Sequence, residues 1–247
     1  MTRQTAPRSP GRHRVALMQP YFLPYLGYFQ LIAAADHFVL YDNVQFIKNG
    51  WIERNRYLLD GEAKWFRIAL AKASHTQHIM QRRIAEQFEL ADLLNKLDFA
   101  YRKAPRRAPV MAWLEALLTP SADSIATLDE RLLKACCTLL GIDTPISRAS
   151  ALPITGEASS QERVIQIVQA CGATHYLNPI GGGHLYQAEA FQQAGITLEL
   201  LGATLPPYSQ GSDSQPFVAG LSILDALMFQ EPEVVGTWAR LGEIQSA

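Results

Sequence analysis

The feature that most constrains the fold is a strand, loop, helix, strand pattern near the N-terminus. An apolar run at residues 15–18 leads into a proline-containing aromatic loop, a helix-like stretch at 26–34 and a second apolar run at 38–41. Two strands joined by a helix form a βαβ unit, in which the strands are parallel and the crossover is right-handed. We therefore expect Gln19 and Asp42, which follow the two strands, to lie at one edge of a sheet, where open α/β sheets bind ligands.

The rest of the chain predicts an α/β fold with an open, mainly parallel, Rossmann-like sheet, a helical insertion and a β-hairpin. Strand-like patterns at 51–59 and 64–70 flank an Asp60-Gly61 turn, which indicates the hairpin. A helical pattern at about 86–141 would form the insertion. Shorter strands and helices then alternate again. They lie at 145–148, 161–170, 174–177, 186–193 and 197–201.

Capping-box patterns mark the starts of two of these helices. Thr127 and Glu130 are spaced as a capping box before an apolar helical run, and Ser159 and Glu162 repeat the pattern. We expect both helices to begin there.

The length and composition predict one large domain. The 247 residues are enough to bury a substantial core without metals or disulfides. Residues 1–13 carry three arginines and two prolines with almost no large apolar side chain, so we expect a disordered tail followed by a single domain at 14–242. Three cysteines without zinc spacing predict buried thiols. We expect neither a metal nor a cofactor.

Charge and hydropathy exclude several classes of protein. A formal net charge of -1 gives no global field that would collect nucleic acid. No apolar run approaches the roughly 20 residues that span a bilayer, and no signal sequence precedes residue 15. We therefore expect a cytoplasmic protein with a small-molecule substrate, and neither nucleic acid nor a membrane span.

The loop after the first strand is rich in prolines and aromatic residues. Prolines fix the backbone φ and remove N–H donors, so the loop should be stiff and should present its side chains. Gln19, Tyr21 and Tyr28 are its polar groups, and we expect them to bind substrate.

Asp42 and Lys48 follow the second strand. The Asp42 carboxylate would emerge where it could act as a general base toward a substrate amine or hydroxyl, or it could cap the following loop through backbone hydrogen bonds. Lys48 could cover an anionic group or be a solvated loop residue. The residues alone leave both alternatives open.

Trp51, Arg54 and Asn55 form a compact set at the start of the hairpin. Arg54 can hold a phosphate or carboxylate with two hydrogen bonds, and Trp51 can stack on a ring. On a regular strand Trp51 and Asn55 share one face while Arg54 points to the other, so a common pocket requires a twist or bulge. The alternative is a half-buried hairpin with a core tryptophan and surface arginines.

Three consecutive glycines lie between Asn178 and His184, after one expected strand and before a helix. The amides of Gly181 and Gly182 and the helix N-terminus could cradle a phosphate. The segment lacks both the dinucleotide and the Walker fingerprints. His184 is a candidate acid or base, or a helix-start histidine without a chemical role.

Polar residues also interrupt the apolar segment near the C-terminus. Tyr208 and Gln210 are further candidates for substrate binding, together with Asp225. Helix capping and turn formation are the alternative roles of such residues.

Six motifs occur in a characteristic order along the chain. They occupy residues 18–31, 36–46, 51–56, 101–105, 180–186 and 221–225. In this order, over residues 15–238, the chain resembles the WbqC-like family. Many relatives carry a histidine where Met18 stands and an asparagine where Glu53 stands.

The resemblance implies a role in the biosynthesis of surface polysaccharides and modified sugars, where some members look like acyl or aminoacyl transferases. We expect transfer of such a group to a nucleotide-linked amino sugar, with an acyl thioester or a carrier protein as donor. Asp42 would accept the amine proton, Arg54 and the glycine loop would hold phosphate, and Trp51 or Tyr21 would stack on a ring.

Two other functions stay open. Pro24-x-x-Gly27 is similar at fold level to the start of nucleotidylyltransferases, although tyrosines stand where those enzymes place histidines. A non-catalytic protein that binds a sugar nucleotide would use the aromatic groups without turnover. Pyrophosphate release would support the first alternative, and saturable binding without product would support the second.

Overall fold

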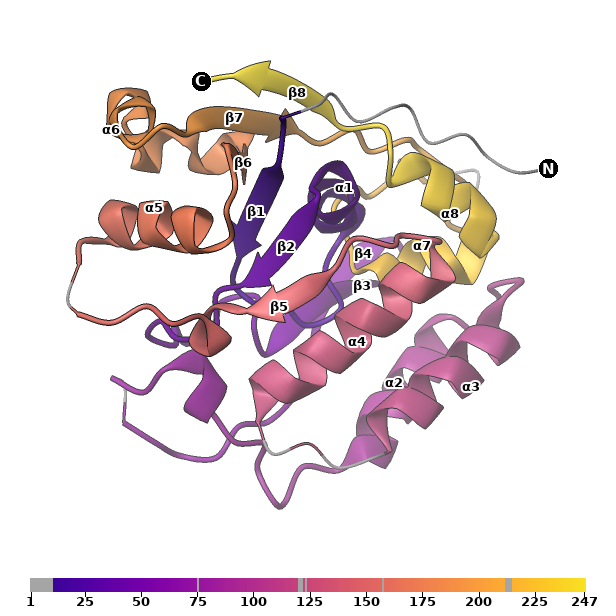
Figure 1. Cartoon of the computed structure of the whole chain (residues 1–247). Coiled ribbons are helices and arrows are strands. Elements are labelled where there is room, and N and C mark those ends of the chain that lie inside the picture. The colour runs from indigo at the N-terminus through magenta and orange to yellow at the C-terminus, as the bar shows by residue number, and fades with distance from the viewer. Residues whose placement is uncertain (1–10, 75, 120–121, 123, 157, 212–214) are drawn as a thin grey trace.

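A computed structural model describes residues 11–74, 76–119, 122, 124–156, 158–211 and 215–247. These residues form three layers, in which a six-stranded sheet lies between two groups of helices (Figure 1). Most of the predicted tail, residues 1–10, lies outside the described residues. Arg12 forms an ion pair with Glu199, and the His13 backbone N–H donates to Thr174 Oγ1 (3.0 Å).

The elements are β1 (Arg14–Met18), α1 (Leu26–Ala34), β2 (His37–Leu40), β3 (Arg54–Leu59), β4 (Glu62–Arg67), η1 (Ile79–Gln81), α2 (Leu90–Ala100), α3 (Arg107–Leu118), α4 (Ile125–Leu139), β5 (Ile146–Arg148), η2 (Ala149–Ala151), α5 (Ser160–Ala170), β6 (His175–Pro179), η3 (Ile180–Leu185), α6 (Ala188–Gln193), β7 (Thr197–Gly202), α7 (Ile223–Phe229), α8 (Pro232–Trp238) and β8 (Glu243–Ser246).

The sheet has the strand order β5-β2-β1-β6-β7-β8, and its strands pair in parallel except for β8, which is antiparallel to β7. Met18 pairs with Leu40 across β1 and β2, and Ala16 pairs with Leu177 across β1 and β6. The chain leaves β1 toward β2 and later returns to β6 on the other side of β1. The predicted mainly parallel α/β sheet is therefore confirmed.

Alternate residues of the strands feed two apolar clusters on the two faces of the sheet. Ala16 and Phe38 belong to the cluster that includes α1, the helical insertion and α7. Val15 and Val39 point the other way, into the cluster under α5 and α6. In Figure 1, α5 and α6 lie to the left of β1, and α1 and α4 lie to its right.

The hairpin and the insertion form where the sequence predicts them. β3 and β4 pair from Arg54 with Arg67 to Leu59 with Glu62. Asp60 and Gly61 both have positive φ (51° and 82°), as a type I′ hairpin turn requires. The helices α2, α3 and α4 occupy the expected insertion.

One predicted cap is confirmed and the other is wrong. Ser159 and Glu162 form a capping box at the start of α5. Helix α4 instead begins at Ile125, because the Ser124 side chain accepts a hydrogen bond from the Thr127 backbone N–H (3.2 Å). Thr127 therefore lies inside the helix.

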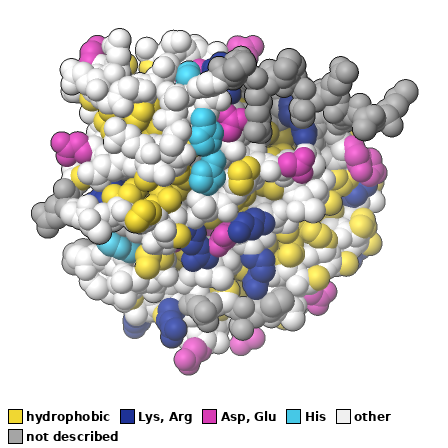
Figure 2. Space-filling model, viewed as in Figure 1, with side chains coloured by type: hydrophobic (Ala, Val, Ile, Leu, Met, Phe, Trp, Pro, Cys, Tyr) yellow, Lys and Arg dark blue, Asp and Glu magenta, His cyan; other side chains and the backbone are white. Residues whose placement is uncertain are grey.

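The surface carries charges of both signs. On the face in Figure 2, basic and acidic side chains are interspersed. Among the described residues, no helix is long and apolar enough to cross a membrane.

Candidate functional site

The loops that carry the motifs leave neighbouring strands at one edge of the sheet. β2, β1 and β6 are adjacent and parallel, so the segments after Leu40, Met18 and Pro179 all begin at the carboxyl edge. The strand order reverses between β1 and β6, which makes this position a topological switch point. Gln19 and Asp42 accordingly lie at the same edge, where the Tyr41 backbone N–H donates to the Met18 carbonyl (2.8 Å).

Asp42 is buried and bonded to a residue that follows β5. Its side chain is 1 % exposed. Its two carboxylate oxygens accept hydrogen bonds from the backbone N–H (3.0 Å) and the hydroxyl (2.7 Å) of Ser150. Arg148 lies 4.0 Å from the same carboxylate. Because Ser150 itself is exposed, its hydroxyl links the buried carboxylate to the surface.

The loop after β1 is held by Tyr28, which is buried. The Tyr28 hydroxyl donates to the Gln19 carbonyl (2.7 Å), and burial raises the pKa of this phenol well above its usual value. The rings of Tyr21 and Tyr28 lie 5.4 Å apart. Gln19 and Tyr21 are half-buried, so they remain the more accessible side chains of this predicted set.

The glycine-rich segment adopts a different structure from the predicted loop and helix start. Gly181 and Gly182 lie within the 3₁₀ helix η3, and α6 begins only at Ala188. Asn178 is buried, accepts from Tyr176 Oη (3.1 Å) and donates to the Pro179 carbonyl (3.0 Å). A Cβ at position 182 would come within 2.8 Å of the Asn178 amide nitrogen, so close packing requires glycine there.

His184 and Lys48 both lie on the surface. His184 lies in the last turn of η3 with an exposed side chain, and Lys48 is exposed in the loop after β2. Among the described residues, neither side chain forms a hydrogen bond with the groups around Asp42 and Gln19 at the carboxyl edge.

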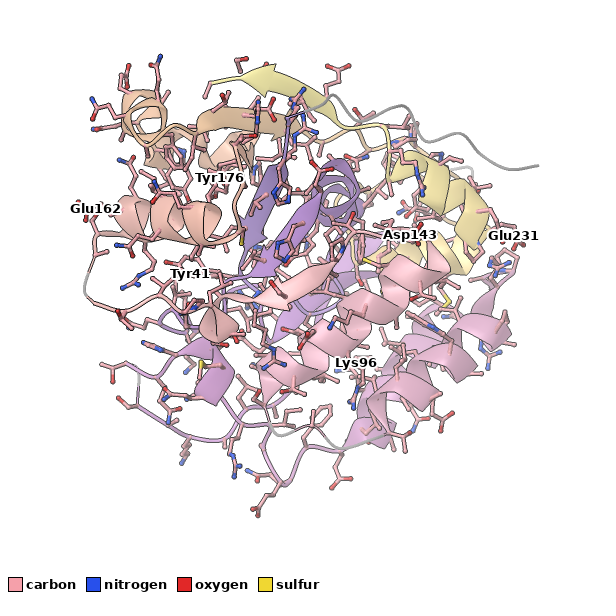
Figure 3. The ribbon with its side chains drawn as sticks, viewed as in Figure 1. Tyr41, Lys96, Asp143, Glu162, Tyr176 and Glu231 are labelled. Atoms are coloured by element: carbon pink, nitrogen blue, oxygen red, sulfur yellow. The ribbon has the colours of Figure 1, made fainter. Side chains whose placement is uncertain are left out.

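Three tyrosines line the α5 side of the switch point. Tyr41 directly follows β2 and Tyr176 lies on β6, and both are near α5 in Figure 3. Tyr176 Oη lies 3.3 Å from Tyr186 Oη. Burial raises the pKa of Tyr41, while the nearby Arg163 lowers it. Sequence reasoning missed this group, since each tyrosine stands in a separate segment.

The outer face of the hairpin carries arginines and tryptophans. Arg54 and Arg56 project from the same face of β3, opposite Arg67 and Trp65 of β4. The Arg54 guanidinium lies 4.0 Å from the Trp65 ring centroid, and Arg56 lies 5.6 Å from that of Trp51. The two tryptophan rings are 5.2 Å apart. These side chains form a row in which two neighbouring tryptophans lie between two arginines, and such a row suits an anionic ligand with a planar ring.

The expectation that Trp51 and Arg54 lie on opposite faces of a strand is wrong. Strand β3 begins only at Arg54, so the alternation of a strand does not extend back to Trp51. Asn55 is the residue on the other face, where it is buried and donates to the carbonyls of Phe22 (3.0 Å) and Leu23 (2.7 Å). Asn55 therefore ties the loop after β1 to the hairpin.

A second polar group forms around Asp225, which is fully buried. Its carboxylate accepts hydrogen bonds from Tyr101 Oη (3.0 Å), Tyr208 Oη (2.7 Å) and Gln210 Nε2 (2.7 Å). Burial raises the pKa of Asp225, and the three hydrogen bonds oppose that shift. The group unites motif segments that lie more than 100 residues apart in the sequence.

Two adjacent cavities lie beside this group. They have volumes of about 270 Å³ and about 200 Å³. Both are lined by Leu58, Gly61, Gln210 and Gln215. Tyr208 lines the larger cavity, while Tyr101 lines the smaller one together with two basic residues, Arg102 and Lys103.

A buried acid was also missed by sequence reasoning. Asp129 is 0 % exposed, and neither carboxylate oxygen has a hydrogen-bond partner among the described residues. Burial, and then the charge of Glu53, raise its pKa well above the usual value. Its position on the apolar side of α4 was the available signal.

Two of the three cysteines are buried as predicted, whereas Cys171 is half-buried. Cys136 and Cys137 are buried, and burial raises the pKa of Cys137 to about 12. Within the described part of the chain, no group of three or more His, Cys, Asp or Glu side chains is arranged to hold a metal.

Comparison with known proteins identifies the family. The profile of the WbqC-like protein family matches residues 19–236. This chain belongs to the WbqC-like family. It is also 28% identical, over 185 residues, to an uncharacterized protein of Mycobacterium tuberculosis. That match covers 74% of this chain and 79% of the relative. No solved structure gives a significant match.

Proposed function

We propose that this WbqC-like protein is a cytoplasmic transferase that moves an acyl or aminoacyl group from a thioester or carrier protein to the amine of a nucleotide-linked amino sugar. The proposal extends what the family resemblance implies about polysaccharide and modified-sugar biosynthesis. The single observation that carries it is the row of Arg54, Trp65, Trp51 and Arg56 on the hairpin.

This row matches the two parts of a nucleoside diphosphate. Guanidinium groups bind phosphate oxygens with two hydrogen bonds, and tryptophan faces stack on a base. The row is attached to the loop after β1, because the Phe22 backbone N–H donates to the Trp51 carbonyl (2.9 Å). A ligand on the hairpin would thus lie beside the loop that follows the first strand at the switch point.

Asp42 and Ser150 provide the base of the proposed reaction. The amine nitrogen forms a bond to the acyl carbon as the carbon–sulfur bond breaks, and the thiolate leaves. The proton of the amine passes to Ser150 Oγ, which gives its own proton to the Asp42 carboxylate at 2.7 Å. General-base catalysis of this kind typically contributes about 10²- to 10⁴-fold to a rate.

The test is transfer to an authentic acceptor by Asp42→Asn and Ser150→Ala. We expect kcat to fall at least about 100-fold in each variant, because the proton has no acceptor. An asparagine can keep a hydrogen bond with the Ser150 backbone N–H, so Asp42→Asn should fold. Ser160→Ala, at another exposed serine, is the matched control. Full activity in Asp42→Asn would exclude the proposed base.

The burial of Asp42 favours a second candidate, a sugar-nucleotide binding protein without turnover. A carboxylate that is 1 % exposed and already accepts two hydrogen bonds is suited to fixing the end of β2 to η2. A thermal-shift screen with nucleotide sugars, nucleoside triphosphates and acyl thioesters, followed by product analysis, separates the two candidates. Stabilisation by nucleotide sugars without product would support binding alone, and pyrophosphate release would indicate nucleotidyl transfer.

A further inference from the structure

The hairpin row and the larger cavity share one face of β3. Arg54, Arg56 and Leu58 alternate along the strand and therefore point to the same side. Leu58 lines the cavity of about 270 Å³. The row of arginines and tryptophans thus leads along the strand to the wall of the cavity.

Arg56 connects the two parts of this face. Its guanidinium donates to the Gly220 carbonyl (3.1 Å), two residues after Val218, which lines the cavity. Its Nε atom is buried, and no residue in the described part of the chain accepts a hydrogen bond from it.

The cavity is suited to a polar ring. Tyr208 and Phe217 contribute aromatic faces, with centroids 5.0 Å apart, and Gln215 contributes an amide. The Tyr208 hydroxyl donates a hydrogen bond to Asp225 (2.7 Å), which fixes the ring at the cavity wall. Gln210 pairs with both backbone groups of Val218 (2.8 Å and 3.1 Å) and so shapes the wall.

We infer that this face binds a nucleotide sugar lengthwise, with the base and phosphates on the arginine and tryptophan row and the sugar ring in the cavity of Tyr208 and Gln215. The inference rests on the proposed function for its choice of a nucleotide sugar. It adds the sugar site and the direction of binding, with Asp225 as a positioning residue.

Charge determines this direction. The phosphates are attracted to Arg54 and Arg56, whereas the buried carboxylate of Asp225 repels an anion at the far end. A hydroxyl group of the sugar can approach Tyr208, whose hydroxyl is hydrogen-bonded to that carboxylate. The reverse orientation would place phosphate near the buried carboxylate of Asp225 and away from both arginines.

The experiment compares the binding of UDP-N-acetylglucosamine and dTDP-glucose with that of UDP and dTDP by calorimetry. We expect at least one sugar nucleotide to bind about tenfold more tightly than its nucleoside diphosphate. Gln215→Ala and Tyr208→Phe should abolish this ratio and leave the diphosphate affinity unchanged. Arg56→Gln should weaken both ligands by about tenfold or more.

Exposed residues elsewhere supply the matched controls. Gln193→Ala on α6 and Arg83→Gln should bind as the wild type does. Tyr208→Phe removes a donor from buried Asp225, so its folding must be checked, whereas Gln215 is exposed and keeps the test valid if Tyr208→Phe unfolds.

The outcomes separate this inference from the proposed function. The inference would be overturned if neither sugar nucleotide binds. It would also be overturned if Gln215→Ala leaves the affinity for the sugar nucleotide relative to the diphosphate unchanged, even if acyl transfer occurs. If the tighter binding of the sugar nucleotide depends on Gln215 but the protein transfers no acyl group, the inference is supported and the proposed function is excluded.

Discussion

Asp129 stands in the middle of α4 with a carboxyl group that is fully buried and has no hydrogen-bond partner among the described residues. Its neighbour Glu130 points outward and pairs with Arg148 (2.6 Å). The charge of Glu53 adds to the effect of burial. Both effects favour the protonated form of Asp129 in the folded state.

This raised pKa predicts a pH dependence of stability. In the unfolded chain Asp129 releases its proton near pH 4, whereas the folded protein retains it to higher pH, so the free energy of unfolding falls as pH rises above about 4. Asp129→Asn cannot ionise and should be more stable than the wild type at pH 7, by about 1 kcal/mol or more.

Urea denaturation at pH 4 and pH 7 measures the difference. The advantage of Asp129→Asn should shrink toward pH 4, and Glu53→Gln should have a smaller effect in the same direction. An exposed acid on α2, changed in Asp92→Asn, is the control. Equal advantages of Asp129→Asn at the two pH values would contradict the predicted ionisation.

At the scale of elements, helix starts differ in how far local sequence specifies them. The capping box of Ser159 and Glu162 is confirmed because both partners are local and exposed. Thr127 has the same spacing to Glu130, but Glu130 pairs with Lys134 and Arg148 instead (2.7 Å and 2.6 Å). Glu130 therefore forms no capping box with Thr127, and Ser124 caps α4 instead.

The cap of α5 is the element-scale prediction. Ser159→Ala removes the acceptor of the Glu162 backbone N–H and should lower the free energy of unfolding by about 1 kcal/mol. Ser160→Ala, one position later and also exposed, should change it by less. Chemical denaturation of the two variants checks the difference, and equal effects would show that the cap does not stabilise the helix.

At the scale of the whole molecule, one sheet separates two apolar clusters. The chain has four tryptophans. Trp65 is on β4 and Trp51 contacts its ring, while Trp113 and Trp238 pack on the cluster that contains α1. None of them is in the cluster under α5. Tryptophan fluorescence therefore reports one side of the sheet, while far-UV circular dichroism reports both.

We expect the two signals to give the same unfolding transition, because both clusters are built on the same strands. Ile167→Ala, on the fully buried face of α5, should destabilise the protein by about 2 to 5 kcal/mol and shift both transitions equally. If the unfolding midpoint of Ile167→Ala shifts by circular dichroism but stays at the wild-type value by fluorescence, the two sides of the sheet unfold separately.

Much of the carboxyl edge follows from the sequence. The apolar runs at β1 and β2, with a helix between them, require parallel neighbours, and the segments after them must then leave at the same edge. The short C-terminal elements were not predicted. Helix α7 is almost entirely buried and has no polar face to show a helical period, and the residues of β8 are exposed.

The sequence by itself determined the parallel sheet, the hairpin turn and the place of the motif loops, because these depend on local periodicity and on turn chemistry. Only the tertiary structure decided which motif residues meet. Tyr101, Tyr208 and Asp225 come together because three separate segments pack against β3, and Trp51 joins Arg56 because the strand begins after it. Such contacts depend on packing between distant segments, which no local pattern encodes.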